Sequence, residues 1–298
     1  MIDRLVGPAI ILLCTVIWGA AFLAQKLGAD HFGPFTLNCY RNLLGGGFLA
    51  LAIVFRRGGI SAILPTRGEL TGGAVSGVVL FAAMMAQQLG IERTTPGISA
   101  FLTANYVLLV PLFAWVVGRG RPSTGVVLGA ALALVGTSCL CLADDALAIG
   151  CGESWTLLCA ALFAVQILVV DRFIVRGDIF RFSMVQLLAA AAVAVPFVFL
   201  PSELARTGWG HFVDGLPALL FVGILSSGIA YTLQNLGQAR TAPSLAAIIM
   251  STESVFGAIF GWVVLGDVMT CRQLLGCGLL FFAVVISQTL ALVRGAER

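Results

Sequence analysis

Apolar windows of about 20 residues recur along almost the whole chain, and this pattern constrains its fold more than any other feature. A helix of that length, at roughly 1.5 Å per residue, crosses the ~30 Å hydrocarbon core of a bilayer. We identify ten such windows, at residues 6–26, 35–55, 70–91, 96–117, 125–142, 155–175, 182–200, 216–238, 242–265 and 273–293. The sequence therefore predicts an all-α polytopic membrane protein with ten transmembrane helices.

Composition supports this fold class. The chain has 298 residues, of which 59% are hydrophobic and only 10% charged, whereas soluble domains carry about 25% charged residues. The mean hydropathy is +1.03. A net charge of +3 is too small to favour nucleic-acid binding, so we expect no nucleic-acid partner. The first window is too long for a signal peptide and contains Trp18, so we expect it to be a retained helix.

The second half of the sequence repeats the first. A shift of 147 residues without gaps places Gln234, Pro243 and Trp262 on Gln87, Pro96 and Trp115, together with several further identities. A weaker match at a shift of 145 aligns residues 12–14 with residues 157–159. We therefore predict two repeats, residues 1–148 and 149–298.

An odd number of helices in each repeat determines how the two halves are related. Five helices per repeat mean that the second half enters the membrane from the opposite side to the first. Such inverted-topology repeats are characteristic of secondary transporters, in which the substrate site lies near the bilayer midplane between the repeats. Helices would then pair one with six, two with seven, three with eight, four with nine and five with ten.

Lys and Arg are distributed unequally between the two sets of predicted loops. With the N-terminus in the cytoplasm, twelve of these residues lie on the cytoplasmic side, and four lie outside: Lys26, Arg93, Arg206 and Arg272. Because positive charge is enriched in cytoplasmic loops, we place both termini in the cytoplasm. We expect the membrane to be the inner membrane of a bacterium.

Glu253 is the strongest candidate for a functional residue. It lies ten residues after Pro243, which places its carboxylate roughly 15 Å into the helix and near the midplane. A charge at that depth is costly, and it marks a functional site by default. The alternative is a protonated acid that only ties two helices together. The shift of 147 makes Tyr106 the equivalent of Glu253 and Asn105 the equivalent of Thr252.

Other polar and aromatic side chains lie at comparable depth. Gln87 near the outer face and Gln234 near the inner face are placed where gates would be, or they bond neighbouring helices. For Tyr106 and Tyr231, packing in the protein core is the alternative to a functional role. Arg41 lies inside the second window, where snorkelling or ion pairing favours a structural role. The residues that we predict to bind substrate are Trp18, Gln87, Asn105, Tyr106, Gln166, Tyr231, Gln234 and Glu253.

No motif indicates an enzyme, a metal site or a cofactor. The chain lacks H-E-x-x-H, G-x-S-x-G and G-x-x-x-x-G-K-[ST] patterns, so transport energy would come from a gradient or from the substrate. Cys151 and Cys271 lie near predicted helix ends, and the sequence leaves two alternatives for them, a disulfide or two free thiols. The run Gly45-Gly46-Gly47 and the pairs Gly125/Gly129 and Gly257/Gly261 predict close helix packing.

Several short motifs resemble one transporter family. Ile17-Trp18-Gly19, Tyr40-Arg41-Asn42, Tyr106 to Leu112 and Thr252-Glu253-Ser254 closing at Leu265-Gly266-Asp267 are similar to motifs of the drug/metabolite transporter superfamily, in its ten-helix EamA-type branch. That family more often has Pro in place of Ser254 and Glu in place of Asp267. The resemblance implies an inverted-repeat carrier with a cavity lined by spans one, three, four, six, eight and nine, and it extends to the YddG-like group of aromatic amino-acid exporters.

The sequence thus predicts a secondary transporter that exports small metabolites, with aromatic or other apolar amino acids as substrates, by alternating access. An efflux carrier for cationic compounds is the alternative within transport, and a lipid flippase or a membrane enzyme is the alternative from another class. The expected partners are a small-molecule substrate and the lipid bilayer, and both a monomer and a homodimer are open.

Overall fold

The computed structural model describes residues 2–94, 96–141, 150–174, 177–206, 208–260, 262–263 and 270–296. All regular secondary structure in these ranges is helical. Gly261 and the motif Leu265-Gly266-Asp267 lie outside the described residues.

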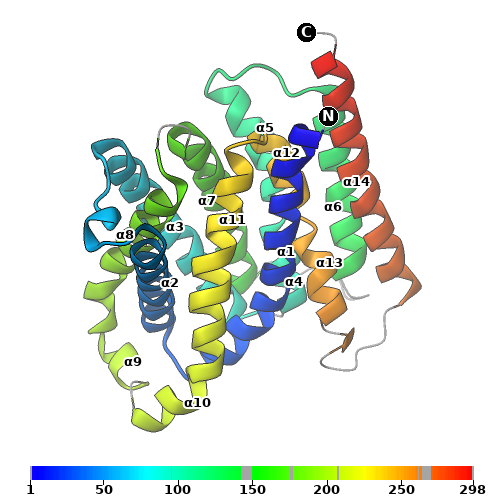
Figure 1. Ribbon diagram of the computed structural model, residues 1–298. Coiled ribbons are helices and arrows are strands. Elements are labelled where there is room, and N and C mark those ends of the chain that lie inside the picture. Colours follow the sequence, from blue (N-terminus) through cyan, green and yellow to red (C-terminus); the bar gives the residue numbers. More distant parts are fainter. Residues whose placement is uncertain are drawn as a thin grey trace.

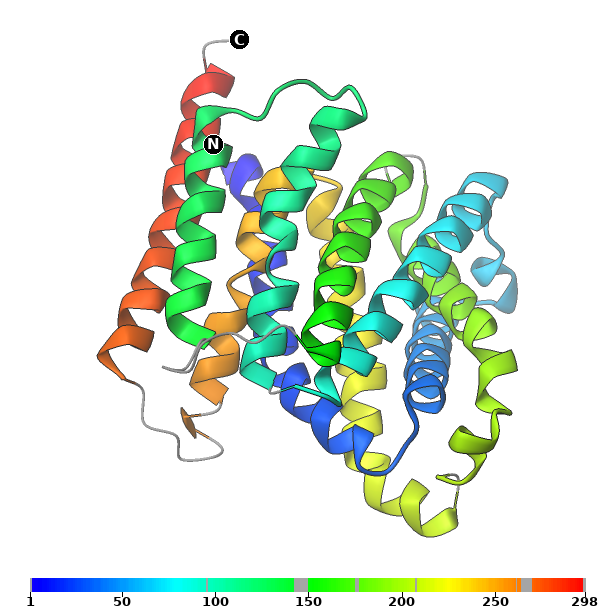
Figure 2. The same cartoon turned by 180° about the vertical axis from the view of Figure 1, so that it is seen from behind.

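Long helices run side by side across the molecule, as both ribbon views show (Figure 1; Figure 2). The first seven are α1 (Ile2–Ala29), α2 (Pro34–Arg57), α3 (Arg67–Ile91), α4 (Pro96–Thr103), α5 (Tyr106–Val116), α6 (Thr124–Cys141) and α7 (Cys151–Phe173). The remainder are α8 (Ile179–Val198), α9 (Pro201–Leu204), α10 (Trp209–Leu220), α11 (Tyr231–Gln238), α12 (Pro243–Met250), α13 (Glu253–Phe260) and α14 (Cys271–Ala296). A short 3₁₀ turn, η1 (Ile60–Ile63), follows α2, and a π-helical stretch, η3 (Phe221–Ala230), joins α10 to α11.

Membrane-spanning length is reached in most of the predicted windows. Among the described residues, eight helical stretches are long and apolar enough to cross a bilayer, and two shorter apolar helices, Thr124–Cys139 and Cys271–Ser287, fall in the fifth and tenth windows. The all-helical membrane fold is therefore confirmed. A count of ten spans and the inverted arrangement of the repeats stay predictions.

The fourth and ninth windows are interrupted where the sequence pattern predicts continuous helices. α4 ends at Thr103 and α5 begins at Tyr106, and α12 ends at Met250 while α13 begins at Glu253. The two breaks occupy equivalent positions of the repeat, because 104–105 and 251–252 differ by 147 residues. Apolar periodicity does not detect such a break, since the residues on both sides of it remain apolar.

Close helix crossings also recur at equivalent positions. A Cβ atom on Gly90 of α3 would lie 3.1 Å from the Gly152 carbonyl oxygen of α7, and one on Gly237 of α11 would lie 2.9 Å from the Gly7 carbonyl oxygen of α1. Gly90 and Gly237 differ by 147 residues, and Gly7 and Gly152 by 145. Small residues let the two backbones approach in both crossings. The same packing rule is thus used twice, as a sequence duplication requires.

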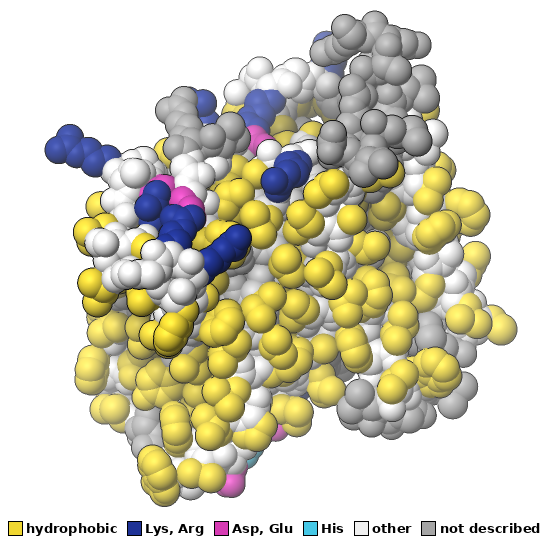
Figure 3. All heavy atoms as spheres, viewed as in Figure 1, with side chains coloured by type: hydrophobic (Ala, Val, Ile, Leu, Met, Phe, Trp, Pro, Cys, Tyr) yellow, Lys and Arg dark blue, Asp and Glu magenta, His cyan; other side chains and the backbone are white. Residues whose placement is uncertain are grey.

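The surface separates into an apolar belt and charged ends. Large apolar side chains such as Leu51, Phe55 and Phe281 are exposed around the helices. In the view of Figure 3, Lys and Arg side chains gather at the end of the molecule where α1 begins and α14 ends. Trp115 and Trp262 are both about half exposed, as expected for side chains at a membrane interface.

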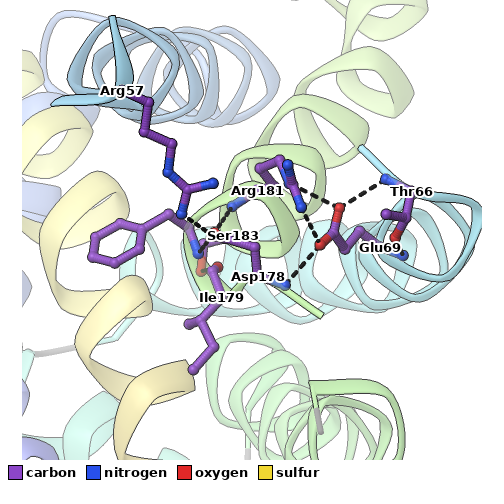
Figure 4. Close-up of polar contacts among 8 residues, drawn as sticks. Arg57, Thr66, Glu69, Asp178, Ile179, Arg181 and Ser183 are labelled. Atoms are coloured by element: carbon purple, nitrogen blue, oxygen red, sulfur yellow. Dashed lines mark hydrogen bonds and ion pairs between the residues drawn. The ribbon is translucent and has the colours of Figure 1, made fainter. Parts of the chain in front are cut away.

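An ionic network ties α2, α3 and α8 together at this basic end (Figure 4). Arg57, the last residue of α2, pairs with Asp178, whose Oδ1 also caps α8 by accepting the backbone N–H groups of Phe180 and Arg181. The Glu69 carboxylate accepts the Asp178 backbone N–H at 2.7 Å and pairs with the Arg181 guanidinium at 2.9 Å. The end of α2 and the start of α3 are thereby held against the start of α8, which is remote from both in sequence.

Acid is expected to loosen this network, and Asp178→Asn tests that expectation. Burial raises the pKa of the Asp178 carboxyl, but hydrogen bonds from Arg57 and the Arg181 backbone N–H outweigh burial, so the pKa lies below its ordinary value of 3.8. A lowered folded-state pKa stabilises the fold above the ordinary value, and this contribution is lost as pH falls through the folded-state pKa. Asn keeps the helix cap and removes the charge. Melting temperatures of the two proteins, measured in detergent, should differ above about pH 4 and converge in stronger acid. A difference in melting temperature that is the same at every pH would contradict the stabilising role of the Asp178 charge.

Candidate functional site

A small cavity lies between α1, α2, α3, α7, η3, α11 and the two broken windows. Its volume is about 40 Å³, which is room for roughly two or three water molecules. The predicted site residues that line it are Trp18, Gln87, Tyr106, Gln166, Tyr231, Gln234 and Glu253. The structure thus brings together residues from six of the predicted spans, and their role in binding substrate stays a prediction.

Glu253 and Tyr106 meet in the wall of this cavity. Both side chains are buried, and the Tyr106 hydroxyl donates to Glu253 Oε1 at 3.3 Å. The two residues are equivalents under the 147-residue shift, so their contact places them where the two repeats face each other. Glu253 is also the first residue of α13. The break before it is a tightened turn, in which the backbone N–H groups of Ser254 and Val255 bond the carbonyl oxygens of Ser251 and Thr252 at 3.3 and 3.0 Å.

Asn105 does not line the cavity, in contrast to the expectation from the sequence. Its Nδ2 donates to the carbonyl oxygens of Phe101 and Leu102, both at 3.1 Å. In the equivalent break, the Ser251 and Thr252 hydroxyls donate to backbone carbonyl oxygens three residues earlier, each at 2.7 Å. Backbone groups freed inside a membrane must find partners within the protein. The polar residues at both breaks therefore have a structural function that depth alone did not reveal.

Replacing Asn105 with Ala should destabilise the fold at the break. The substitution removes the side-chain donor to the Phe101 carbonyl oxygen, and leaving a buried carbonyl oxygen unpaired costs about 1–3 kcal/mol. The Leu102 carbonyl oxygen still accepts the Asn105 backbone N–H at 3.2 Å. We expect a lower melting temperature in detergent than for Leu112→Ala, a control at an exposed position of α5. Equal melting temperatures for the two variants would show that the break does not need the amide.

Two glutamines leave hydrogen-bonding atoms free in the cavity. Gln234 Nε2 donates to Gln166 Oε1 at 3.3 Å. Gln166 Nε2 and Gln234 Oε1 are buried and have no partner among the described residues. Because buried polar atoms are normally bonded, one donor and one acceptor are available here to a polar group of a ligand. Gln87, the repeat equivalent of Gln234, is also buried in the cavity wall.

Aromatic rings form the apolar part of the wall. The Trp18 and Tyr231 rings meet edge to face, with centroids 4.9 Å apart, and Phe22 and Phe163 also line the cavity. Trp18 Nε1 donates to the Ser226 carbonyl oxygen in η3 at 3.3 Å, so the indole is fixed in orientation. Such a wall suits an apolar side chain of a ligand.

Arg41 is a cavity residue for which sequence analysis favoured a structural role. It is 2% exposed, so it does not snorkel to the interface, and no carboxylate among the described residues pairs with it. Its partners are Gln25 Oε1 and the hydroxyls of Ser226 and Ser227. One signal in the sequence could have identified it, since the second window holds this Arg and no acidic residue.

Cysteines and acidic residues form no metal site within the described part of the chain. Cys151 and Cys271 are both exposed free thiols in this structure.

Comparisons with known proteins agree with this architecture. A sequence model described as the EamA-like transporter family matches residues 5–142 and again residues 150–289. An uncharacterized transporter of Archaeoglobus fulgidus is 26% identical over 285 residues, which cover 96% of this chain and 86% of the relative. A chloroplastic WAT1-related protein of Arabidopsis thaliana is 24% identical over 288 residues, 90% of this chain and 66% of the relative. One solved crystal structure superposes with a TM-score of 0.78 at 20% identity, covering 96% of both chains, which shows a shared fold.

Proposed function

The chain belongs to the EamA-like transporter family, and from this premise we propose that it is a secondary carrier of small amine-bearing metabolites, with amino acids of aromatic or other apolar side chain as its substrates. The transporters among its relatives support the general activity. The substrate class rests on the cavity.

The observation that carries the proposal is the buried Glu253 carboxylate in the cavity wall. A carboxylate at that depth is costly unless it is paired, and its side-chain partner among the described residues is the neutral Tyr106 hydroxyl. A substrate ammonium group would compensate the charge. The rings of Trp18 and Tyr231 would pack on an apolar side chain, and the free amide atoms of Gln166 and Gln234 would bond its polar groups.

The size of the cavity and the form of the repeats support alternating access. A volume of about 40 Å³ is well below the 300–1,000 Å³ of pockets that hold drug-sized ligands. Substrate entry therefore requires the cavity to widen. The two repeats, residues 1–148 and 149–298, would rock against each other, and the equivalent helix breaks and equivalent glycine crossings support an inverted arrangement.

The distribution of charge supports one orientation in the membrane. The basic end of the molecule, where Arg57, Arg119 and Arg172 are exposed, would face the cytoplasm of a bacterium, because positive residues are enriched on that side. Both termini would then be cytoplasmic.

Efflux of lipophilic cations is the second candidate function, because Glu253 and the aromatic rings would also suit a cationic drug.

A substrate-panel counterflow assay on the purified protein in proteoliposomes tests the proposal. We expect vesicles loaded with unlabelled amino acid to accumulate labelled amino acid with an aromatic or other apolar side chain, and lipophilic cations to compete weakly. Strong competition by lipophilic cations and none by amino acids would support the efflux alternative. An absence of exchange for all amine-bearing compounds would refute the proposal.

A further inference from the structure

Arg41 is a buried cation in the wall of the same cavity, and no anion among the described residues pairs with it. Its side chain is 2% exposed, and it lies seven residues into α2, roughly 10 Å along that helix. An unpaired charge in that position is expensive. In the described part of the chain its acceptors are neutral: Ser227 Oγ at 3.0 Å, with Gln25 Oε1 and Ser226 Oγ both at 3.1 Å.

The guanidinium keeps donors free for a ligand. It carries five N–H groups, and the three neutral partners take one from each nitrogen. One N–H therefore remains on each of the two terminal nitrogens. A planar guanidinium binds a carboxylate through two such N–H groups in a fork.

Neighbouring helices hold the guanidinium in place. Ser226 and Ser227 are adjacent in the π-helical stretch η3, and both hydroxyls reach Arg41. Trp18 and Gln25 lie seven residues apart on α1, a spacing that puts both side chains on one helix face. Trp18 bonds the Ser226 carbonyl oxygen, while Gln25 bonds Arg41. The guanidinium is therefore held in one orientation in the cavity wall.

We propose that Arg41 binds the carboxylate of the substrate, so that the cavity recognises a zwitterion through Arg41 and Glu253 together. This inference rests on the proposed function, because it assumes that Glu253 receives the substrate ammonium group. The two charged residues line one cavity and form no ion pair with each other. A molecule with both groups compensates both charges. A monocation would compensate Glu253 and leave Arg41 unpaired and repulsive.

Three probes that differ by one charged group test the inference on the full-length protein. These are L-phenylalanine, 2-phenylethylamine, which lacks the carboxylate, and 3-phenylpropionate, which lacks the ammonium group. In the wild-type protein, thermal stabilisation in detergent should be greatest with L-phenylalanine. Loss of a charge-assisted hydrogen-bonded pair should weaken binding of each analogue about 10- to 100-fold. This readout needs no variant.

Arg41→Gln provides the second measurement, with Arg41→Lys as its partner. Arg41→Gln should weaken L-phenylalanine binding about 10- to 100-fold and leave 2-phenylethylamine binding unchanged or stronger. The affinity of Arg41→Lys for L-phenylalanine should lie between those of the wild type and Arg41→Gln, because Lys keeps the positive charge but cannot bind a carboxylate through two N–H groups of a planar guanidinium. Equal binding of L-phenylalanine and 2-phenylethylamine by the wild-type protein would overturn the role of Arg41 while keeping an amine carrier. Absence of binding for both would overturn the proposed function as well. If Arg41→Gln does not fold, the wild-type comparison still decides.

Discussion

Glu253→Gln is expected to lower exchange of amine-bearing substrates at least about 100-fold in proteoliposomes. The substitution keeps the size of the side chain and an acceptor for the Tyr106 hydroxyl, but it removes the charge that would compensate the substrate ammonium group. Breaking a buried ion pair by removing one partner costs about 3–5 kcal/mol, and each 1.4 kcal/mol is a factor of about ten. Initial rates of counterflow with a labelled amino acid measure the effect.

Two other variants separate the charge from its surroundings. Tyr106→Phe removes the hydroxyl that contacts Glu253 but keeps the carboxylate. One neutral hydrogen bond contributes about 0.5–1.5 kcal/mol, so exchange should fall by no more than about tenfold. Glu92→Gln changes a partly buried carboxyl that lies outside the cavity, and its exchange rate should match the wild type. Wild-type exchange by Glu253→Gln would end the role proposed for this carboxylate.

Sequence reasoning pointed to Glu253 and to its repeat equivalent, Tyr106. Glu253 was identified from depth alone, because one charged side chain in a long apolar window is unusual whatever the fold. The contact with Tyr106 is consistent with the repeat, since residues related by an approximate two-fold axis touch only near that axis. The choice of Glu253 needed no atomic detail, whereas its contact with Tyr106 is seen only in the structure.

Asn105 and Arg41 show why the rest was missed. Depth indicates that a polar residue must be satisfied, but it does not identify the partner. The Asn105 amide donates to two backbone carbonyl oxygens at a helix break, and the break itself leaves no trace in the apolar pattern. Arg41 was assigned a structural role because an ion pair was the expected partner, whereas its partners come from η3 and α1 and are neutral. Such tertiary contacts are not encoded in the window that contains the residue.

The glycine run in α2 was predicted to be a packing surface, and its three members in fact face different surroundings. A Cβ on Gly45 would lie 2.9 Å from both the Gly223 carbonyl oxygen and the Gly228 nitrogen in η3. A Cβ on Gly46 would meet the Leu188 side chain of α8 at 2.7 Å, and a Cβ on Gly47 would meet nothing within 4 Å. Sequence spacing identifies a small-residue surface, but it does not tell which of three adjacent glycines allows the close approach.

Gly45→Leu is therefore expected to abolish the folded transporter, while Gly47→Leu leaves it intact. Both substitutions replace the same residue type in the same helix with the same side chain. At Gly45 the new atoms meet backbone, which cannot move aside as a flexible side chain can, and overpacking of this kind costs about 1–3 kcal/mol or more. At Gly47 the substitution removes a residue that disfavours helix by about 1 kcal/mol. Size-exclusion profiles and melting temperatures in detergent measure the difference.

A milder substitution at the same position connects packing to recognition. Gly45→Ala adds only the Cβ, and a variant that still folds must move η3 away from α2. That movement carries Ser226 and Ser227 away from the Arg41 guanidinium, so exchange of L-phenylalanine should fall more than exchange of 2-phenylethylamine. Gly47→Ala, which adds the same atom on the open side of the helix, should change neither rate. Equal losses for the two substrates in Gly45→Ala would mean that the η3 crossing stabilises the fold without positioning the cation.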